Sequence, residues 1–176
     1  MTGAVAPSSH RLGQEMICGL PLDRAAVVVE YGPGTGSFTG RILQAIGKDT
    51  RFFAIESDSA MTCRLTSNYP DIEVVNGSVE CLPDIIRSIG GPSVDCIVSG
   101  LPWASFDCDL QDRLMDVTLA ALKDGGRFHT FAYLQGLAFK SGRRFRDQLK
   151  HRFTKVILSP VVWYNFPPAL VYKCIK

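Results

Sequence analysis

The chain has 176 residues, of which 46% are hydrophobic and 20% charged; this is typical of one globular domain and excludes a disordered chain. A formal net charge of +2 is too small to indicate a nucleic-acid partner by itself. The 6 cysteines show neither C-x-x-C nor metal-ligand spacing, so we expect reduced thiols and no metal site. No apolar run is long enough for a membrane span, and the first residues lack a secretory leader pattern. A cytoplasmic protein is expected.

Strand-like and helical patterns alternate along the chain. Strands are predicted at residues 25–31, 51–56, 72–75, 94–99, 126–133, 154–158 and 169–175. Helices are predicted at residues 8–19, 37–47, 58–68, 79–89, 109–123 and 142–151. The short link between the last two strands favours a mostly parallel seven-stranded sheet with an antiparallel final strand and helices on both faces. The predicted class is therefore α/β, with residues 1–20 as an N-terminal lid or interfacial helix and residues 21–176 as one domain.

The first predicted strand ends in an acid, Glu30, and a glycine-rich turn follows it. Glycine tolerates a sharp turn and lets a ligand approach the backbone closely, because it has no Cβ. A strand, a glycine turn and a helix N-terminus together predict a nucleotide-type pocket. A tight turn without a ligand is the alternative. The predicted binding residues here are Glu30, Gly32, Gly34 and Gly36.

The spacing of these glycines distinguishes between nucleotides. A dinucleotide fingerprint would place its third glycine at Ser37, and the Gly-Lys-Ser/Thr of a phosphate-binding loop is absent. The order of residues 30–36 instead resembles the first motif of class I S-adenosylmethionine-dependent methyltransferases. The resemblance implies a Rossmann-like methyltransferase domain in which the glycine N–H groups and the acid hold the amino-acid end of S-adenosylmethionine.

Two further loops are predicted to hold the nucleoside. Glu56 ends the second strand about 20 residues beyond the glycine turn, where a carboxylate accepts hydrogen bonds from ribose hydroxyls. Ser57 follows it, and Ser78 and Val79 follow the third strand, where methyltransferases often contact adenine. A solvated acid and a plain turn are the respective alternatives.

The loop after the fourth strand reads Ser99-Gly100-Leu101-Pro102-Trp103. It resembles the Asn-Leu-Pro-Tyr loop of amine-methylating enzymes, with Gly100 in place of the asparagine. The resemblance implies that Ser99 lies at the cofactor, that Gly100 and Trp103 act on the amine, and that Leu101 and Pro102 contact substrate. A turn with a buried Trp103 is the alternative.

Tyr133, at the end of the fifth predicted strand, completes the predicted catalytic set. A primary amine has a pKa of roughly 10 and must lose a proton before it attacks a methyl group. An apolar pocket lowers that pKa by desolvation, and Tyr133 can accept a hydrogen bond from the amine. The rings of Trp103 and Tyr133 can also face a methylated ammonium.

A basic segment, residues 140–155, follows. Its 7 Lys and Arg residues accompany a single acid, Asp147, and Phe145, Leu149 and Phe153 recur every four residues. Arg143 and Arg144 are predicted to meet the phosphates of an anionic membrane. A surface helix with its phenylalanines packed on the sheet is the alternative, and both can hold, with arginines exposed toward phosphate and phenylalanines buried.

Four segments together carry a narrower resemblance. They are residues 3–9, including Ser8 and Ser9; residues 99–102; residues 125–128; and residues 165–169. In this order they resemble the small bacterial phosphatidylethanolamine N-methyltransferases, distant relatives of rRNA adenine dimethylases. The resemblance implies a phospholipid substrate, a peripheral position at the inner membrane face, and Ser8 and Ser9 near the cofactor. The serines can alternatively cap the first helix.

Three other functions stay open. A soluble small-molecule N- or O-methyltransferase fits the same scaffold. An RNA adenine methyltransferase is disfavoured by Gly100, by the small net charge and by the lack of a separate RNA-binding domain. A non-catalytic cofactor-binding protein is the remaining hypothesis.

Overall fold

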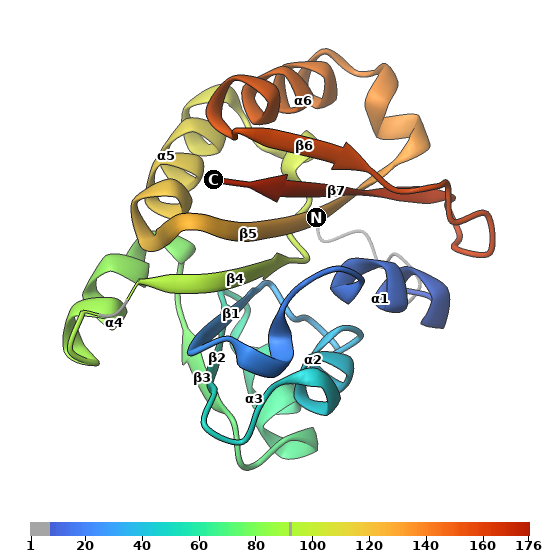
Figure 1. Cartoon of the computed structure of the whole chain (residues 1–176). Helices are drawn as coiled ribbons and strands as arrows, with labels where there is room; N and C mark the ends of the chain where they lie inside the picture. The colour runs from blue at the N-terminus through green and yellow to red at the C-terminus, as the bar shows by residue number, and fades with distance from the viewer. Residues whose placement is uncertain (1–7, 92) are drawn as a thin grey trace.

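The computed structural model describes residues 8–91 and 93–176, and one seven-stranded sheet forms its centre (Figure 1). The strands are β1 (Val27–Tyr31), β2 (Arg51–Glu56), β3 (Glu73–Asn76), β4 (Val94–Ser99), β5 (Leu122–Tyr133), β6 (Lys155–Leu158) and β7 (Ala169–Ile175). Their order is β3-β2-β1-β4-β5-β7-β6. Strand β7 is antiparallel to both of its neighbours, whereas the other paired strands are parallel. The predicted Rossmann-like α/β class and its antiparallel final strand are confirmed.

Helices cover both faces of the sheet. Alternate residues of a strand point to opposite faces, so β1 places Val27 and Val29 in one apolar cluster and Val28 in the other. The first cluster includes residues of α4, α5 and α6, and the second includes residues of α1, α2 and α3. Both faces are therefore buried, as expected of parallel strands. The helices are α1 (His10–Ile17), α2 (Thr39–Ala45), α3 (Ser59–Asn68), α4 (Leu82–Ser88), α5 (Cys108–Ala121) and α6 (Lys140–Arg152).

The strand order reverses between β1 and β4. The connections from these two strands lead to opposite sides, which leaves a crevice at the carboxyl ends of the strands, where such sheets bind ligands. The loops that follow β1, β2, β3 and β4 meet at this edge. The fold thus brings the loops that carry Gly32, Glu56 and Ser78 to one edge of the sheet.

Two features of the chain trace differ from the predictions. Helix α5 ends at Ala121, and β5 begins at Leu122, four residues before the predicted strand. Leu122 pairs with Val94 of β4 and is 1% exposed. Its burial brings residues 122–125, which precede the predicted strand, into the sheet. Four short 3-10 turns, too short to produce a periodic pattern, were also not predicted; they are η1 (Leu22–Arg24), η2 (Val79–Cys81), η3 (Trp103–Ser105) and η4 (Leu134–Ala138).

The first helix is attached to the sheet through its apolar face. Leu12 and Met16 are fully buried, and Nδ1 of His129 on β5 lies 2.9 Å from the Met16 carbonyl oxygen. Burial lowers the pKa of His129 to about 4, so its ring is neutral and Nδ1–H donates to that carbonyl. Residues 1–7, which carry part of the N-terminal motif, lie outside the described residues. Among the helices that are described, none has the length and apolarity to cross a membrane.

Candidate active site

A cavity of about 160 Å³ lies at the edge of the sheet where the loops after β1 to β4 meet. Six of its lining residues belong to the predicted site, and they come from four separate loops: Gly32, Glu56, Ser57, Ser78, Val79 and Leu101. The sequence-based prediction missed the apolar wall of Ile55, Phe106, Leu110 and Leu114, and also Gly77. The apolar face of α5 was visible in the sequence. Its position over this cavity depends on the η3 turn, which was not predicted.

The glycine loop takes a backbone conformation that favours glycine at each of its three positions. The φ angles are 58° at Gly32, 55° at Gly34 and 84° at Gly36, values that side chains with a Cβ rarely adopt. A Cβ on Gly36 would lie 2.8 Å from Cε2 of Tyr69. Open space surrounds the Gly34 position, so there the backbone is accessible for a ligand to approach.

Glu30 lies behind the glycine loop and is fully buried. The hydroxyl of Thr39 donates to its Oε2 at 2.7 Å, while Oε1 has no hydrogen-bond partner among the described residues. Burial, with a smaller contribution from the negative charge of Glu56, raises the pKa of Glu30 to about 8. Glu30 does not line this cavity. Its unpartnered oxygen fits a cationic group bound at the loop, such as the ammonium of S-adenosylmethionine.

Glu56 ends β2 and is 8% exposed. Its Oε2 accepts from the Gly34 N–H at 3.0 Å, and its Oε1 accepts from the Asp58 N–H at 3.0 Å. A carboxylate offers about four acceptor positions, so two remain for the hydroxyls of a ribose. These contacts hold the second acid against the glycine loop and on the wall of the cavity.

Ser78 acts as a cap at the start of η2. Its hydroxyl accepts from the Glu80 N–H at 3.2 Å, and the side chain of Val79 is buried beside it. Val79 forms the apolar wall of the cavity together with Leu101, Leu110 and Leu114. A flat apolar ring such as adenine suits such a slot.

The loop after β4 approaches the glycine loop at backbone distance. The Gly100 N–H donates to the Tyr31 carbonyl at 2.7 Å, and a Cβ on Gly100 would lie 2.6 Å from the Gly32 carbonyl oxygen. Only glycine fits there without displacing the backbone. This contact accounts for glycine at the position where amine-methylating enzymes carry asparagine.

Trp103 is 2% exposed and packs in the core. Its indole Nε1–H donates to the Ser99 hydroxyl at 2.9 Å, and its ring stacks on Phe145 with 4.8 Å between centroids. Ser99, predicted at the cofactor, is fully buried and does not line the cofactor cavity. Its hydroxyl instead orients Trp103.

A second cavity, of about 500 Å³, lies between the loop after β4, the η4 turn and the start of α6. Leu101 lines both cavities, so the two adjoin. No charged side chain among the described residues lines this one. The predicted residues Pro102, Trp103 and Tyr133 do, and so do aromatic residues that were not predicted: Phe131, Phe139, Phe145 and Tyr172. Burial raises the pKa of Tyr133 above its ordinary value, so its hydroxyl stays protonated at neutral pH.

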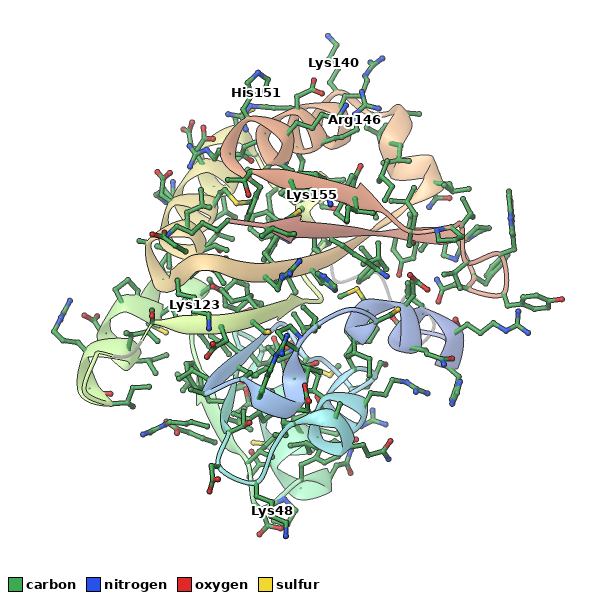
Figure 2. All side chains as sticks on the ribbon, viewed as in Figure 1. Lys48, Lys123, Lys140, Arg146, His151 and Lys155 are labelled. Atoms are coloured by element: carbon green, nitrogen blue, oxygen red, sulfur yellow. The ribbon has the colours of Figure 1, made fainter. Side chains whose placement is uncertain are left out.

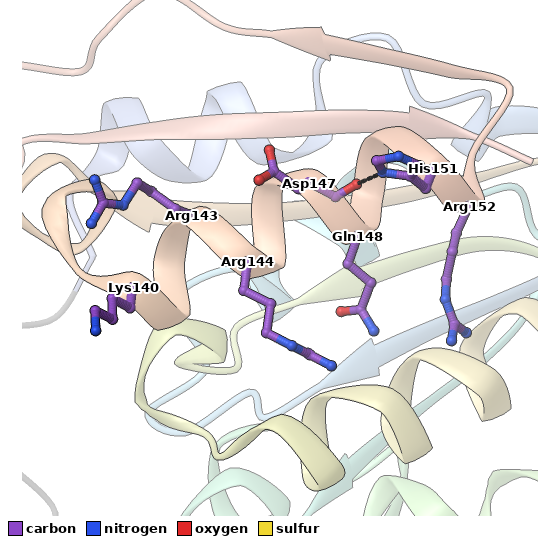
Figure 3. Close-up of a pocket in the computed structure, with 7 residues that line it drawn as sticks. All are labelled: Lys140, Arg143, Arg144, Asp147, Gln148, His151 and Arg152. Carbon is purple, nitrogen blue, oxygen red and sulfur yellow. Dashed lines mark hydrogen bonds between the residues drawn. The ribbon is translucent and has the colours of Figure 1, made fainter.

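The basic helix α6 buries its apolar stripe. Phe145, Leu149 and Phe153 pack into the core that covers the sheet. On the polar side, Arg144 pairs with Asp112 of α5 at 2.6 Å, and Arg152 pairs with Asp116. Figure 3 shows Arg144 and Arg152 pointing toward α5. Figure 2 shows Lys140 and His151 at the outer surface of this helix.

The N-terminal motif meets the C-terminal one. The Ser9 N–H donates to Oδ1 of Asn165 at 2.9 Å, although the two residues are 156 positions apart. The Ser9 hydroxyl accepts from the Leu12 N–H and so caps α1. Asn165 in turn donates to the Pro167 carbonyl at 2.7 Å, and Pro167 lines the second cavity. Neither Ser8 nor Ser9 lines the cofactor cavity.

Comparison with known proteins gives the family. No family model matches the chain. The ornithine lipid N-methyltransferase of Singulisphaera acidiphila is 32% identical over 174 residues, which cover 97% of this chain and 86% of that protein. An O-methyltransferase of Bacillus cereus, solved with S-adenosylhomocysteine, has a TM-score of 0.73 at 13% identity, covering 96% of this chain and 82% of its own. An rRNA methylase of Streptococcus thermophilus has a TM-score of 0.64 at 19% identity, covering 94% of this chain and 95% of its own.

The site geometry and these similarities agree on the methyl donor. The glycine loop, the acid at the end of β2 and the apolar slot fit S-adenosylmethionine, and an O-methyltransferase of Streptomyces achromogenes with a TM-score of 0.72 and 17% identity, covering 96% of this chain and 81% of its own, was solved with that cofactor. No group of side chains that could hold a metal occurs among the described residues. The chain is an S-adenosylmethionine-dependent methyltransferase of class I, and it belongs to the family that contains the Singulisphaera acidiphila ornithine lipid N-methyltransferase.

Proposed function

We propose that this enzyme N-methylates the amine headgroup of a membrane lipid, phosphatidylethanolamine in the first instance. The observation that carries the proposal is the uncharged cavity of about 500 Å³, which adjoins the cofactor cavity through Leu101. Such a cavity suits a lipid that presents its amine to the donor. The ornithine lipid named for the similar Singulisphaera protein also carries an amine, so it is the second substrate to test.

The proposed chemistry depends on an amine that has lost its proton. S-adenosylmethionine supplies the electrophilic methyl group when it is bound. The amine nitrogen forms a bond to the methyl carbon, the carbon–sulfur bond breaks with its electron pair on sulfur, and the amine proton passes to solvent. An uncharged cavity disfavours the ammonium form and so promotes that proton loss. The groups proposed to hold the amine are Tyr133, which lines this cavity, and the backbone oxygen of Gly100, which precedes the lining residue Leu101. The Tyr133 and Trp103 rings line the path of the amine.

Some of the residues proposed to contact the cofactor line the first cavity, whereas Glu30, Gly34 and Gly36 do not. Glu56 holds the ribose hydroxyls and Ser57 lies beside it, while Ser78 and Val79 contact adenine. Glu30 and the three glycines hold the amino-acid end. For the described part of the N-terminal segment, residues 8–20 with Ser8 and Ser9, an interfacial role is proposed.

The membrane contact proposed for residues 140–155 centres on Arg143. Arg144 pairs with Asp112, whereas the exposed Arg143 and Lys140 have no ion-pair partner among the described residues. Each basic residue near an anionic lipid surface contributes about 1 kcal/mol to binding. A variant Arg143→Ala is therefore expected to weaken binding to anionic vesicles more than Arg144→Ala.

The test is transfer of a radiolabelled methyl group from S-adenosylmethionine into vesicles. Vesicles containing phosphatidylethanolamine, vesicles containing ornithine lipid, and soluble phosphoethanolamine are assayed in parallel. We expect label in chloroform-extractable lipid and none in the soluble amine. Label in the soluble amine alone, or in no acceptor while the enzyme binds its cofactor, would refute the lipid substrate.

A further inference from the structure

Three large aromatic side chains protrude from one short loop between β6 and β7. In this loop, residues 162–166, termed the aromatic loop, Trp163 is 69% exposed, Tyr164 is 76% exposed and Phe166 is 84% exposed. Figure 1 shows the segment between β6 and β7 projecting beyond the sheet, at the side where the N-terminal helix α1 lies. Clustered exposed apolar residues mark interaction sites, whereas apolar residues scattered singly over a surface do not.

The aromatic loop is held in place by hydrogen bonds. Asn165, at its centre, is 3% exposed; it accepts from the Ser9 N–H and donates to the Pro167 carbonyl. The Val162 N–H donates to the Ala169 carbonyl at 2.7 Å. The polar residue of the loop therefore points inward and the aromatic residues point outward, so their exposure is built into the fold.

The base of the aromatic loop forms part of the second cavity, of about 500 Å³, which is proposed to hold the methyl acceptor and is termed the acceptor cavity. Pro167 follows Phe166 directly and lines that cavity, and the Pro168 carbonyl accepts from the Leu134 N–H at 2.9 Å. Phe139 lines the same cavity and is 61% exposed. The cavity thus reaches the surface beside exposed aromatic side chains.

Unpaired cations accompany these aromatic residues. The Arg11 guanidinium lies 4.3 Å from the centroid of the Tyr164 ring, and Lys140 and Arg143 follow Phe139 at the start of α6. None of the three has an ion-pair partner in the described part of the chain. Tryptophan and tyrosine together with lysine and arginine are typical of side chains at a membrane–water interface, where the rings meet the acyl boundary and the cations meet phosphates.

We propose that Trp163, Tyr164 and Phe166 of the aromatic loop, together with Phe139, insert into the interfacial region of an anionic lipid bilayer. Insertion sets the opening of the acceptor cavity against the headgroups. This inference depends on the proposed lipid substrate for its purpose, but its test does not require turnover. It assigns the apolar part of membrane binding to the aromatic loop and the electrostatic part to Arg11, Lys140 and Arg143.

The first experiment uses the native protein and vesicles that contain phosphatidylglycerol and phosphatidylcholine without any amine acceptor. The chain has 2 tryptophans, and Trp103 is buried already, so a change in fluorescence reports on Trp163. We expect a blue shift with these vesicles, and quenching when the lipids carry bromine in their acyl chains. An unshifted and unquenched emission would overturn the proposal.

The second experiment compares variants in vesicle sedimentation. The triple variant Trp163→Ser, Tyr164→Ser, Phe166→Ser is expected to lose more than about tenfold in partition, since each ring gives up apolar burial. Ile157→Ser is the matched control, because Ile157 is 44% exposed on β6 outside the aromatic loop. Equal loss in the control, or undiminished binding of a triple variant that still binds S-adenosylmethionine, would overturn the proposal.

These outcomes separate the two proposals. Insertion of Trp163 without methylation of any lipid would refute the proposed substrate and support the membrane contact. Methylation of vesicle lipid by the triple variant at the native rate would support the substrate and overturn the role of the aromatic loop.

Discussion

The Gly32 carbonyl oxygen and the Gly100 backbone are in such close contact that a Cβ at position 100 would lie 2.6 Å from that oxygen. This contact joins the loop after β1 to the loop after β4, at the point where the strand order reverses. The two loops carry residues proposed to bind the cofactor and residues proposed to bind the amine. Their backbones therefore set the distance between donor and acceptor.

Replacing Gly100 by alanine is expected to push the two loops apart. We expect a loss of about 1–3 kcal/mol in the free energy of unfolding, and a larger loss in turnover than in cofactor affinity, because the amine side of the site moves. Urea unfolding and steady-state kinetics measure these effects. Gly77→Ala, whose added Cβ would meet only Cys81 Sγ at 3.5 Å, is the control for stability. An equal loss of stability in both variants would contradict a close backbone contact at Gly100.

Glu30 is expected to make stability depend on pH. Its pKa is about 8 in the folded protein, well above that of a free glutamate, so the unfolded chain releases this proton at lower pH than the folded one. The contribution of Glu30 to the free energy of unfolding is present in full below pH 4.5, the pKa of this group before burial. That contribution is lost as pH rises toward 8, because the unfolded chain releases the proton first. Glu30→Gln should remove that loss, so that the variant is more stable than the native enzyme at pH 8 but not at pH 4.

Glu30→Gln should also weaken the binding of S-adenosylmethionine. Glu30 is protonated at neutral pH in the free protein, and it can release that proton when the ammonium of S-adenosylmethionine binds beside it. An amide cannot ionise, so we expect about tenfold weaker binding. Urea unfolding at several pH values and calorimetric titration measure the two effects. Unchanged cofactor affinity would show that Glu30 serves the glycine loop alone.

Glu56 is expected to contribute to cofactor binding through both its charge and its contact with the glycine loop. Glu56→Ala removes the acceptor of the Gly34 N–H together with the proposed ribose acceptor. We expect about ten- to a hundredfold weaker binding, equivalent to about 1–3 kcal/mol. Glu56→Gln, which keeps one oxygen acceptor, should lose less. Calorimetric titration with S-adenosylhomocysteine measures both, and equal losses would argue against the hydrogen bonds.

Ser99 is expected to matter for stability through Trp103. Ser99→Ala leaves the buried indole N–H without its acceptor, which costs about 1–3 kcal/mol in the free energy of unfolding. Ser105→Ala, at an exposed serine in the neighbouring η3 turn, should be neutral. Urea unfolding of both variants tests this. A Ser99→Ala variant of undiminished stability that binds the cofactor more weakly would instead support the predicted position of Ser99 at the cofactor.

Tyr133 is expected to act through its hydroxyl group. Tyr133→Phe keeps the ring in the acceptor cavity but removes the hydrogen-bonding group, so turnover should fall by about tenfold while binding of the cofactor is retained. Calorimetric titration with S-adenosylhomocysteine is the control that the cofactor site is intact. Unchanged turnover in Tyr133→Phe would exclude a polar role in catalysis.

Much of the fold could be predicted because its signals are local. The apolar run before Glu30 and the glycines at 32, 34 and 36 determine a strand and a loop through backbone preferences that act within a few residues. The start of β5 was placed four residues late because the burial of Leu122 depends on its partner Val94 in another strand. Residues 126–133 show the strand pattern by themselves, whereas Leu122 joins the sheet through that pairing.

The features of the candidate site also divide into those that local patterns predict and those that depend on tertiary contacts. The fold class, the glycine loop and the acid at the end of β2 could be predicted from local residue patterns, since parallel strands bring such loops to one edge. Long-range contacts in the folded chain explain the glycine at position 100, the hydrogen bond from Trp103 to Ser99, the contact of Ser9 with Asn165 and the inward packing of the α6 phenylalanines. Each of these depends on contacts between residues distant in the chain, and the packing of side chains across elements determines them, not the periodicity within one element.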